Sequence, residues 1–380
     1  MNPKITIIGG GIAGLTTAIA LGQKGYIAEV YESAKEIRGV GAGLALAANA
    51  MKGLERLGLL EEVEALGRVL PSFSILDQKG KVITKADSAA ISKKYGLDNF
   101  LIHRADLHEF LLSKIDPKLI HTGKRAVSFQ YVHDKIEVIF SDASIKMTDY
   151  LIVANGIHSA IRTQLLPDAV PRYSGYTCWR AVIDNRDLEI NESSETWGSK
   201  GRFGIAPLSK NQLYWFACVN AKENDPEMKA MTTEDLSAIF KNYHEPIGTI
   251  ISNTANDQLI WNDIVDLEPI TRYAFERILL LGDAGHATTP NMGQGACQAI
   301  EDAVVLADEL DKNRNVQKAF QSFEKRRLER THYITNTSWK VGRIAQLENH
   351  VLTAIRNFTF RNLPRSINDK QIDKVLQTDF

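Results

Sequence analysis

The residues near the amino terminus whose spacing could do chemistry are glycines. Gly9, Gly11 and Gly14 form a Gly-x-Gly-x-x-Gly turn between a short apolar run, residues 5–8, and a helix-like stretch that ends near Lys24. In such a turn the first glycine permits a tight bend, the second lets the backbone approach a pyrophosphate, and the third allows close packing of helix and strand. The helix N-terminus adds unpaired amide N–H groups and a partial positive charge. The spacing therefore predicts a phosphate-binding turn.

A carboxylate follows the glycine turn at the distance that ribose recognition requires. Residues 27–31 have the pattern of a second strand, and Glu32 comes at its end. In dinucleotide-binding folds an acidic residue about 20 residues after the glycines accepts hydrogen bonds from a ribose hydroxyl. The alternative, a glycine-rich turn with a surface glutamate, leaves this spacing unexplained. The sequence therefore predicts a dinucleotide site that includes Glu32.

A second set of polar residues and glycines lies far along the chain. Residues 277–281 have the continuous apolar pattern of a buried parallel strand, and Asp283 follows them closely. We expect Asp283 to accept hydrogen bonds from hydroxyls of a cofactor chain; its alternative role is to cap a strand-to-helix turn. The loop at residues 290–295 leads into a helix, and the backbone N–H groups expected to face an anion there are those of Gly293, Gln294, Gly295 and Ala296.

Together with Arg104, these two regions resemble the class A flavoprotein monooxygenases. The likeness extends over about residues 4–327 and includes the glycine turn, Glu32 and the segment from Gly282 to Gly295. It implies that FAD is the cofactor, with Glu32 on the adenosine ribose, Asp283 on the ribityl chain and Arg104 beside the cofactor. It also implies that the backbone lies close to FAD at Ala13, Ser33 and Ala126. Without the resemblance, the sequence around Arg104 indicates a solvated arginine at the start of a helix.

A third element of that family departs from its usual form in this chain. The family pattern has Asp-Gly followed by Ser and Arg, whereas this chain has Asn155, Gly156, Ser159 and Arg162. A neutral hydrogen bond at Asn155 would then replace a salt bridge. His158 and Arg162 are candidates for contacting NAD(P)H phosphates, with a helix-start histidine and a surface arginine as the alternatives.

The nicotinamide nucleotide is expected to bind only in passing. No second Gly-x-Gly-x-x-Gly sequence occurs in the chain, so nothing predicts a separate nicotinamide domain. This matches a family in which NAD(P)H is a transient co-substrate.

Arg202 and Tyr214 are the candidate catalytic residues. They lie on two predicted strands, and their register resembles the bacterial FAD-dependent urate hydroxylases, where an arginine and a tyrosine orient the substrate. The resemblance implies hydroxylation of a small aromatic or heteroaromatic ring with dioxygen, through a flavin C4a-hydroperoxide. For Tyr214, ordinary core packing is the alternative. We expect Trp179 and Trp215 to pack on a sheet face.

Two other functions fit the same residues. A flavin reductase or dehydrogenase of this fold would transfer hydride without inserting oxygen. A non-catalytic flavin-binding protein is suggested by the altered Asn155. Dependence of the reaction on dioxygen separates the first from a monooxygenase, and reduction of FAD by NADH or NADPH separates the second.

The order of these segments predicts an α/β protein: a Rossmann-like FAD-binding domain of discontinuous segments, an inserted mainly antiparallel β-sheet substrate domain, and C-terminal helices. The predicted boundaries are 1–71, 100–171 and 272–330 for the FAD-binding domain, 72–99 and 172–271 for the substrate-binding β-sheet domain, and 331–380 for the helical segment. We expect a helix with Asn49 as its N-cap and a solvated helix face at residues 325–327.

Composition limits the partners. The 380 residues are 44% hydrophobic and carry a formal net charge of −1, so no overall field attracts nucleic acid or an anionic membrane. The three cysteines, Cys178, Cys218 and Cys297, have no metal-ligand spacing, so we expect no metal, and reduced thiols in a cytoplasmic protein. The uncharged stretch at residues 5–21 is short for a membrane span. We expect a monomer or homodimer without stable membrane association.

Overall fold

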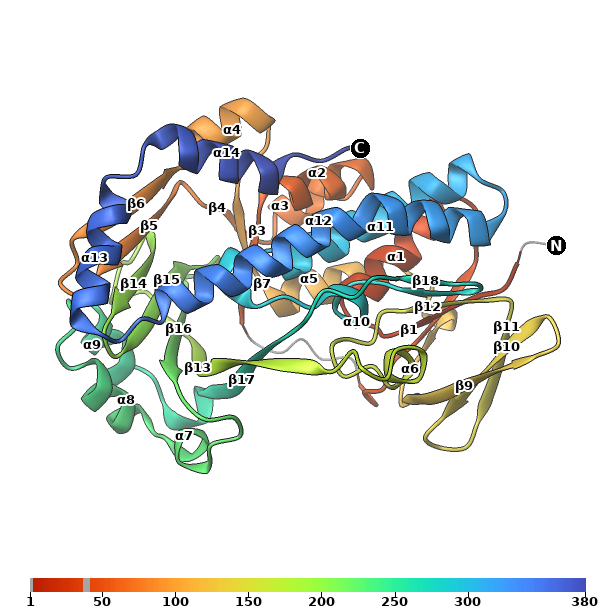
Figure 1. Ribbon diagram of the computed structural model, residues 1–380, viewed down its shortest axis with the longest axis horizontal. Coiled ribbons are helices and arrows are strands. Elements are labelled where there is room, and N and C mark those ends of the chain that lie inside the picture. Colours follow the sequence, from red (N-terminus) through yellow and green to blue (C-terminus); the bar gives the residue numbers. More distant parts are fainter. Residues whose placement is uncertain (1–2, 37–41) are drawn as a thin grey trace.

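The computed structural model describes residues 3–36 and 42–380, and the part of it that carries the glycine turn is a six-stranded sheet (Figure 1). The strand order is β18 (Ala274–Phe275), β19 (Ile278–Leu280), β12 (Tyr150–Val153), β1 (Ile5–Ile8), β2 (Ala28–Tyr31) and β8 (Ile120–His121). The four strands from β19 to β2 are parallel, and β18 runs antiparallel to β19. Central strands of this kind are buried on both faces, which explains the continuous apolar runs in β1 and β19.

Helices cover this sheet and fix the glycine turn against it. They are α1 (Ile12–Gln23), α2 (Ala48–Arg56), α3 (Leu60–Glu64), α5 (Arg104–Ser113), α6 (Ala160–Leu165), α10 (Asp283–His286), α11 (Gly295–Lys312) and the long α12 (Val316–Ala345). α1 packs along α11, although 271 residues lie between Gln23, where α1 ends, and Gly295, where α11 begins. The main hydrophobic core joins β1, α1, β12, β19 and α11, so segments distant in sequence form one unit.

A second sheet of seven strands, counted over the described ranges, stands beside the first (Figure 1). Its order is β17 (Ile260–Leu267), β13 (Pro171–Asp184), β16 (Gln212–Asn220), β15 (Gly201–Pro207), β14 (Ser193–Gly198), β5 (Ser72–Asp77) and β6 (Val82–Asp87). Neighbouring strands are antiparallel except β14 and β5. The mixed α/β fold class expected from the sequence is confirmed.

The outer face of this second sheet is packed and dry. Phe203 and Trp215 stack with their ring centroids 5.2 Å apart, and Trp179 lies in the same cluster. This cluster packs against α8 (Thr233–Phe240) and α9 (Ile247–Ser252), with α7 (Pro226–Ala230) and the 3₁₀ turn η2 (Asn256–Gln258) nearby in sequence. Because side chains alternate along a strand, the neighbouring positions face the other way, toward the first sheet.

The remaining elements flank these two units. They are β3 (Gly43–Leu46), β7 (Phe100–His103) and β4 (Arg68–Val69) in one small sheet, and β9 (Ala126–Val132), β10 (Lys135–Phe140) and β11 (Ile145–Thr148) in another. The 3₁₀ turns η1 (Pro117–Leu119) and η3 (Pro290–Met292), and the helices α4 (Ser88–Tyr95), α13 (His350–Arg361) and α14 (Arg365–Leu376), complete the chain. The strands expected near residues 5–8, 27–31 and 277–281 and the C-terminal helices are confirmed.

Some local expectations were wrong. Asn49 is not an N-cap: α2 is preceded by Ala47, and the Asn49 side chain is buried inside the protein. Arg327 does not belong to a solvated face, because only 2% of it is exposed. β14 and α9 were not anticipated from the sequence at all.

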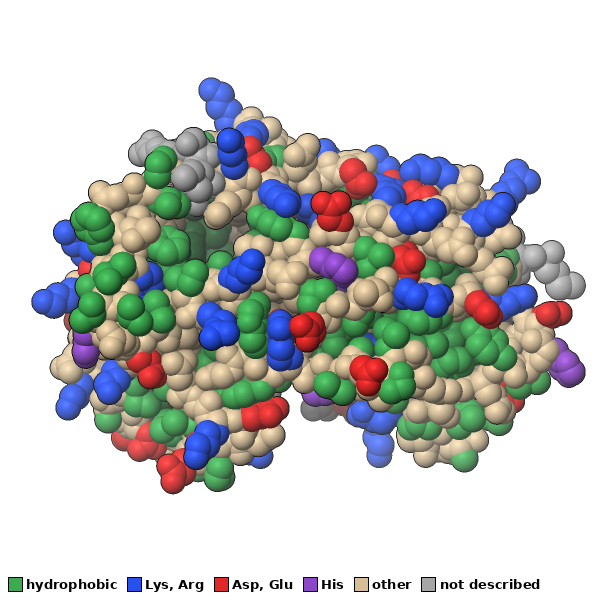
Figure 2. All heavy atoms as spheres, in the orientation of Figure 1, with side chains coloured by type: hydrophobic (Ala, Val, Ile, Leu, Met, Phe, Trp, Pro, Cys, Tyr) green, Lys and Arg blue, Asp and Glu red, His purple; other side chains and the backbone are tan. Residues whose placement is uncertain are grey.

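The surface carries charges of both signs. On the face shown in Figure 2, Lys and Arg side chains are interspersed with Asp and Glu side chains, in keeping with the formal net charge of −1. Within the described ranges, no helix is both long enough and apolar enough to cross a membrane.

Two glycines of α1 provide a matched test of the helix–strand contact. A Cβ at Gly14 would lie 1.9 Å from the backbone oxygen of Gly9, whereas a Cβ at Gly22 meets no atom within 4 Å. We expect Gly14→Ala to lower the free energy of unfolding by about 1–3 kcal/mol, because the turn must shift. Gly22→Ala should instead stabilise the helix by about 0.5–1 kcal/mol. Chemical denaturation measures both, and equal effects would contradict the packing described here.

Candidate functional site

A single cavity of about 860 Å³ brings the two predicted regions and the predicted catalytic residues together. The predicted site residues in its lining are Gly9, Gly11, Ala13, Glu32, Ser33, Arg104, Ala126, Asp283, Gly293, Gln294, Gly295, Ala296, Arg202 and Tyr214. Gly14 does not reach the cavity; it lies where α1 touches the turn at Gly9. The cavity is therefore long, with the glycine turn and the second sheet contributing different parts of its wall.

The glycine turn is shaped to receive a ligand's phosphates. Gly9 has a φ of +112°, a conformation that favours glycine, and its N–H donates to the oxygen of Tyr31 at 2.8 Å. A Cβ at Gly11 would meet no protein atom within 4 Å, so the space there belongs to the cavity. α1 begins at Ile12, and the amide groups of its first turn have no partner inside the helix. These features fit a pyrophosphate.

Glu32 organises the turn as well as facing the cavity. Its Oε2 accepts from the Gly10 N–H at 2.7 Å, and its Oε1 accepts from the Ala34 N–H at 2.7 Å and from the Ser33 hydroxyl at 2.9 Å. Burial alone would raise the pKa of Glu32, but the hydrogen bonds from Ala34 and Gly10 outweigh it, and the pKa is lowered. The carboxylate is therefore ionised throughout the neutral range, as ribose binding requires.

The second loop presents a carboxylate and a helix N-terminus. Asp283 follows Gly282, whose φ is +59°, and solvent reaches its side chain through the cavity. The surrounding protein raises the pKa of Asp283, and the charges of His286 and Arg104 partly oppose this. α11 starts at Gly295, directly after Gln294. Gly293, one residue before Gln294, has a left-handed backbone conformation. The Asp283 carboxylate can accept hydrogen bonds from a polyhydroxyl chain. The free amide groups of α11 can donate to the electron-rich edge of a ring beside that chain.

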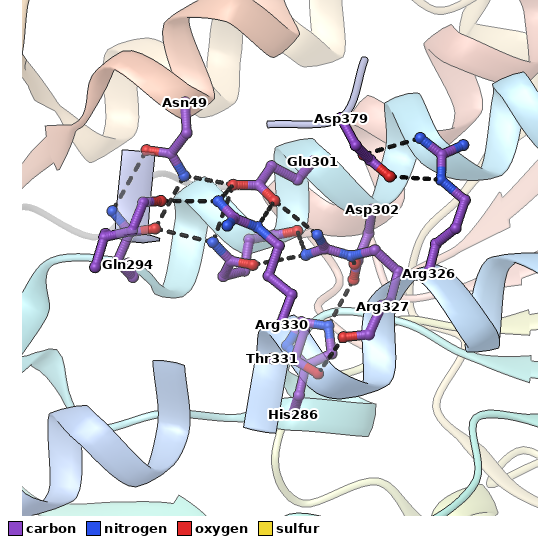
Figure 3. Close-up of polar contacts among 12 residues, drawn as sticks. Asn49, His286, Gln294, Glu301, Asp302, Arg326, Arg327, Arg330, Thr331 and Asp379 are labelled. Carbon is purple, nitrogen blue, oxygen red and sulfur yellow. Dashed lines mark hydrogen bonds and ion pairs between the residues drawn. The ribbon is translucent and has the colours of Figure 1, made fainter. Parts of the chain in front are cut away.

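Behind this loop lies a buried network centred on Asp302 (Figure 3). The Asp302 Oδ2 accepts from the Gly282 N–H at 2.9 Å and pairs with His286 Nε2 at 2.6 Å. Its Oδ1 accepts from Arg327 Nε at 2.6 Å. Burial raises the pKa of Asp302, yet the charges of His286 and Arg327 dominate and lower it. His286 therefore helps to position the loop that carries Asp283.

The network continues to Glu301 and to the start of α11 (Figure 3). Glu301 pairs with Arg327 at 2.6 Å and with Arg330, and it accepts from the Asn49 amide. The same Asn49 amide donates to Gln294 Oε1 at 2.9 Å. The Gln294 side chain is thus engaged with α2, so only its backbone is available to a ligand. Arg330 also donates to the oxygen of Val375 at 2.8 Å, which ties α14 to the network.

Arg202 reaches the cavity with its charge already paired. Arg202 Nη1 donates to Glu195 Oε1 at 3.0 Å, and its Nε donates to Gln346 Oε1 at 3.0 Å. Its guanidinium carbon lies 5.1 Å from the centre of the Tyr176 ring. Only 2% of Arg202 is exposed. Burial and the Glu195 partner together make this a neutral ion pair in the wall, rather than a free cation.

Tyr214 lies further along the same wall. It pairs with Ala206 on β15, whereas Arg202 pairs with Cys218, so Tyr214 and Arg202 are not opposite each other. A Cβ at Gly43 would lie 2.5 Å from the Tyr214 ring, so that ring packs against the start of β3. Burial raises the pKa of Tyr214, so its hydroxyl is protonated at neutral pH and can donate a hydrogen bond.

Sequence reasoning missed four residues in this part of the wall: Cys178, Arg180, Glu195 and Cys218. Arg180 lines the cavity, donates to the Asn262 side chain, and has a buried Nε without a hydrogen-bond partner in the described residues. The available signal was alternation. Trp179 and Ala181 are buried in the outer cluster, so Cys178 and Arg180 had to face the cavity.

The segment from Asn155 to Arg162, which departs from the family's Asp-Gly pattern, has residues that line the cavity and one that is buried. Asn155 and His158 line the cavity, and the buried Asn155 Oδ1 has no partner among the described residues. Arg162 is 1% exposed, and its Nε donates to the oxygen of Ala169 at 3.1 Å. The expectation of a surface arginine was therefore wrong, and burial also removes Arg162 as a phosphate contact. An unpaired amide oxygen at Asn155 is suited to a donor on a bound ligand.

A glycine turn, a carboxylate at ribose distance and a second helix N-terminus around one cavity define a dinucleotide-binding protein of the flavin type. The family model described as "FAD binding domain" matches residues 3–338, and the chain belongs to that family. FAD is accordingly its cofactor. Three features of the site fit it: the open space at Gly11, the free amides of α1 and α11, and the Asp283 carboxylate facing the cavity.

Relatives and solved structures agree with this assignment. An aurachin C monooxygenase/isomerase of Stigmatella aurantiaca is 35% identical and covers 98% of this chain and 97% of its own. A 2-heptyl-3-hydroxy-4(1H)-quinolone synthase of Pseudomonas aeruginosa is 31% identical, covering 95% of this chain and 94% of its own. The crystal structure of Klebsiella pneumoniae HpxO complexed with FAD and uric acid is similar with a TM-score of 0.92 and 30% identity, over 98% of this chain and 97% of that one.

Glu32 offers a test of the cofactor site that depends on pH. We expect Glu32→Gln to weaken FAD binding at least tenfold, since a hydrogen bond to a charged group contributes about 1.5–3 kcal/mol. The pKa of Glu32 in the folded protein is lowered, so its carboxylate can accept a hydrogen bond from FAD above that pKa and loses this role as pH falls through it. Wild-type FAD affinity should therefore drop in acid more steeply than that of Glu32→Gln.

Fluorescence of released FAD measures this affinity across the pH range. Ser33→Ala is the matched control, because it removes one hydrogen bond to Glu32 Oε1 and leaves the carboxylate in place. A Glu32→Gln protein that binds FAD as tightly as Ser33→Ala at neutral pH would contradict the role given to this carboxylate.

Proposed function

We propose that this FAD-dependent monooxygenase uses NAD(P)H and dioxygen to hydroxylate an aromatic or heteroaromatic ring that carries an oxygen substituent. The observation that carries the proposal is one cavity whose lining runs from the glycine turn to Arg202, Arg180 and Tyr214. Bound FAD supplies the reduction and activation of dioxygen. The residues of this chain then have to bind the ring, orient it and keep water away from it.

Arg180 and Tyr214 are the proposed contacts to the ring oxygen. Arg180 donates through Nη2 to the neutral Asn262 side chain, and its buried Nε has no acceptor among the described residues. Tyr214 keeps its proton at neutral pH because burial raises the pKa of its hydroxyl. Both can therefore donate to a carbonyl or phenolic oxygen, and such donors stabilise negative charge that develops on that oxygen as the ring is attacked.

Arg202 is proposed to orient the substrate through a paired charge. Because Glu195 neutralises the charge of Arg202, the pair offers a polar surface that does not require an anionic substrate. Phe216 and Ile264 supply apolar wall in the same region and exclude water. The relatives named for quinolone chemistry cover this chain almost completely, and a quinolone is a ring of this kind, so we propose such heteroaromatic compounds ahead of urate.

In this proposal the two sheets bind different ligands. The segments 1–71, 100–171 and 272–330 hold FAD, the segments 72–99 and 172–271 hold the ring, and the helical segment 331–380 braces both. NAD(P)H is proposed to bind in passing near His158, which is exposed and lines the cavity. A cytoplasmic monomer or homodimer acting on small molecules completes the proposal.

The reaction class is tested with purified holoenzyme. We expect NADH or NADPH oxidation to be stimulated by 4-hydroxyquinoline or a related oxygen-bearing ring, and the product to gain one oxygen atom from ¹⁸O-labelled dioxygen. Stimulated oxidation that persists without dioxygen would indicate a reductase instead. Bound FAD that neither nucleotide reduces, across a broad ring panel, would indicate a binding protein.

The Arg202–Glu195 pair makes a specific prediction about substrate charge. Glu195→Gln leaves the Arg202 cation without its carboxylate. We expect the variant to bind urate, an anion, about tenfold more tightly relative to neutral 4-hydroxyquinoline than the wild type does, since one charge contact of this kind contributes about 1.4 kcal/mol. Titration of the flavin absorbance spectrum measures both ligands. An unchanged ratio of affinities would show that Glu195 does not set the charge of the ring site.

A further inference from the structure

Two of the three cysteines face each other in the wall of the cavity. Cys178 on β13 and Cys218 on β16 are direct partners in the antiparallel register. Both line the cavity, and both are buried in the wall, at 5% and 1% exposure. They share a small apolar cluster with Tyr176, on the side of the sheet that faces away from Trp179 and Trp215. Their position follows from strand pairing rather than from spacing in the sequence.

The register places an arginine next to the thiols. Arg202 on β15 is the direct partner of Cys218, so Arg202, Cys218 and Cys178 form a row across three strands. Arg180 follows Cys178 two residues later on the same face. The Cys218 thiol lowers the pKa of Cys178, burial opposes this, and the charges of Arg180 and Arg202 lower it further. The Glu195 carboxylate that pairs with Arg202 opposes this lowering, so the unpaired positive charge beside the Cys178 thiol comes from Arg180, and a neighbouring cation favours the reactive thiolate.

The distance between paired strands allows a bond between the two sulfurs. Directly opposite residues of antiparallel strands have Cα atoms about 4.5–5.5 Å apart, within the range of about 4.4–6.8 Å that disulfides span. Their Cβ atoms lie about 4.5–5.5 Å apart, somewhat more than the usual value of about 3.8 Å. The bond would therefore draw β13 and β16 together locally, and a strained disulfide of this kind is readily reduced.

We propose that Cys178 and Cys218 are a peroxide-reactive dithiol site that closes the ring end of the cavity when oxidised. The Cys178 thiolate attacks hydrogen peroxide; an S–O bond forms, the O–O bond breaks, and hydroxide leaves as water after taking a proton. The Cys218 sulfur then attacks the Cys178 sulfur, the S–S bond forms, and the S–O bond breaks. The hydroxyl group leaves with the Cys218 proton as a second water. Two thiols are oxidised and one peroxide is reduced to two waters.

The oxidant is hydrogen peroxide, and the site lies where a flavin oxygenase would release it when dioxygen is reduced without a substrate. That source rests on the proposed function, whereas the reaction of the thiols with added peroxide does not. Closing the wall beside Arg202 and Arg180 would block ring binding and leave the glycine turn untouched. The enzyme would then stop wasting NAD(P)H until a thiol reductant restores it.

The third cysteine supplies the control. Cys297 lies on α11, its Sγ donates toward the oxygen of Gly293 at 3.4 Å, and burial raises its pKa to about 12. It neither lines the cavity nor pairs with another cysteine in the described residues. Peroxide should leave it unchanged.

The experiment treats FAD-loaded enzyme with a modest excess of hydrogen peroxide and then alkylates the free thiols under denaturing conditions. We expect the alkylated cysteines to fall from three to one, with a peptide linking Cys178 to Cys218 and with Cys297 alkylated. Binding of 4-hydroxyquinoline, followed by the flavin spectrum, should be lost while FAD stays bound, and dithiothreitol should restore it.

Variants separate the steps. Cys218→Ser should retain a sulfenic acid on Cys178 that dimedone labels, Cys178→Ser should give no label, and Cys297→Ser should still form the link. Three alkylated cysteines after peroxide, or a link that includes Cys297, would overturn the proposal even if every variant folds poorly, because the wild type alone reports them. A ring panel that never stimulates NAD(P)H oxidation contradicts the proposed function instead, without affecting the thiol result.

Discussion

The buried carboxylate of Asp302 fixes the geometry on which both ends of the site depend. Removing a charge from water costs several kcal/mol, and the cost is offset only when opposite charges and hydrogen-bond donors lie in good geometry around it. Asp302 meets this condition with Gly282, His286 and Arg327. Because Gly282 directly precedes Asp283, this ionic centre sets where the cofactor-facing carboxylate lies. Arg327 is held at the same time by Glu301 at 2.6 Å, so the two carboxylates fix its position together.

The cavity combines two different ways of building a wall. At the glycine turn the ligand meets backbone: φ at Gly9 is positive, and a helix begins three residues later. At the second sheet it meets side chains presented by strand alternation, with Trp215 packed behind and Tyr214 in front. A backbone-lined end tolerates little change in sequence, whereas a side-chain-lined end can vary from relative to relative. The relatives named above carry names for different rings, which fits a wall of this second kind.

Local rules predicted which residues of the glycine turn, the end of β2 and the Asp283 loop line the cavity, and they missed much of the wall at the second sheet. The glycine turn, Glu32 and the Asp283 loop were predictable because each depends on neighbours within a strand, a turn and a helix. Arg327 and Asn49 were misjudged, since their burial depends on helices α2, α11 and α12 meeting around Glu301. Glu195 and Cys178 were missed for a similar reason. Their importance comes from cross-strand register, and nothing in a single sequence states which residue of β16 lies opposite Cys178.

Helix α12 touches both halves of the site and joins them mechanically. Arg327 on this helix bonds Asp302, Ser338 bonds the oxygen of Thr289 at 2.7 Å, and Gln346 at its end bonds Arg202. An α-helix turns about 100° and rises about 1.5 Å with each residue. Inserting or deleting one residue between Arg327 and Gln346 would rotate one contact by about 100° around the helix axis relative to the other. The number of residues on α12 between Arg327 and Gln346 is therefore fixed, and natural insertions or deletions must lie in loops elsewhere.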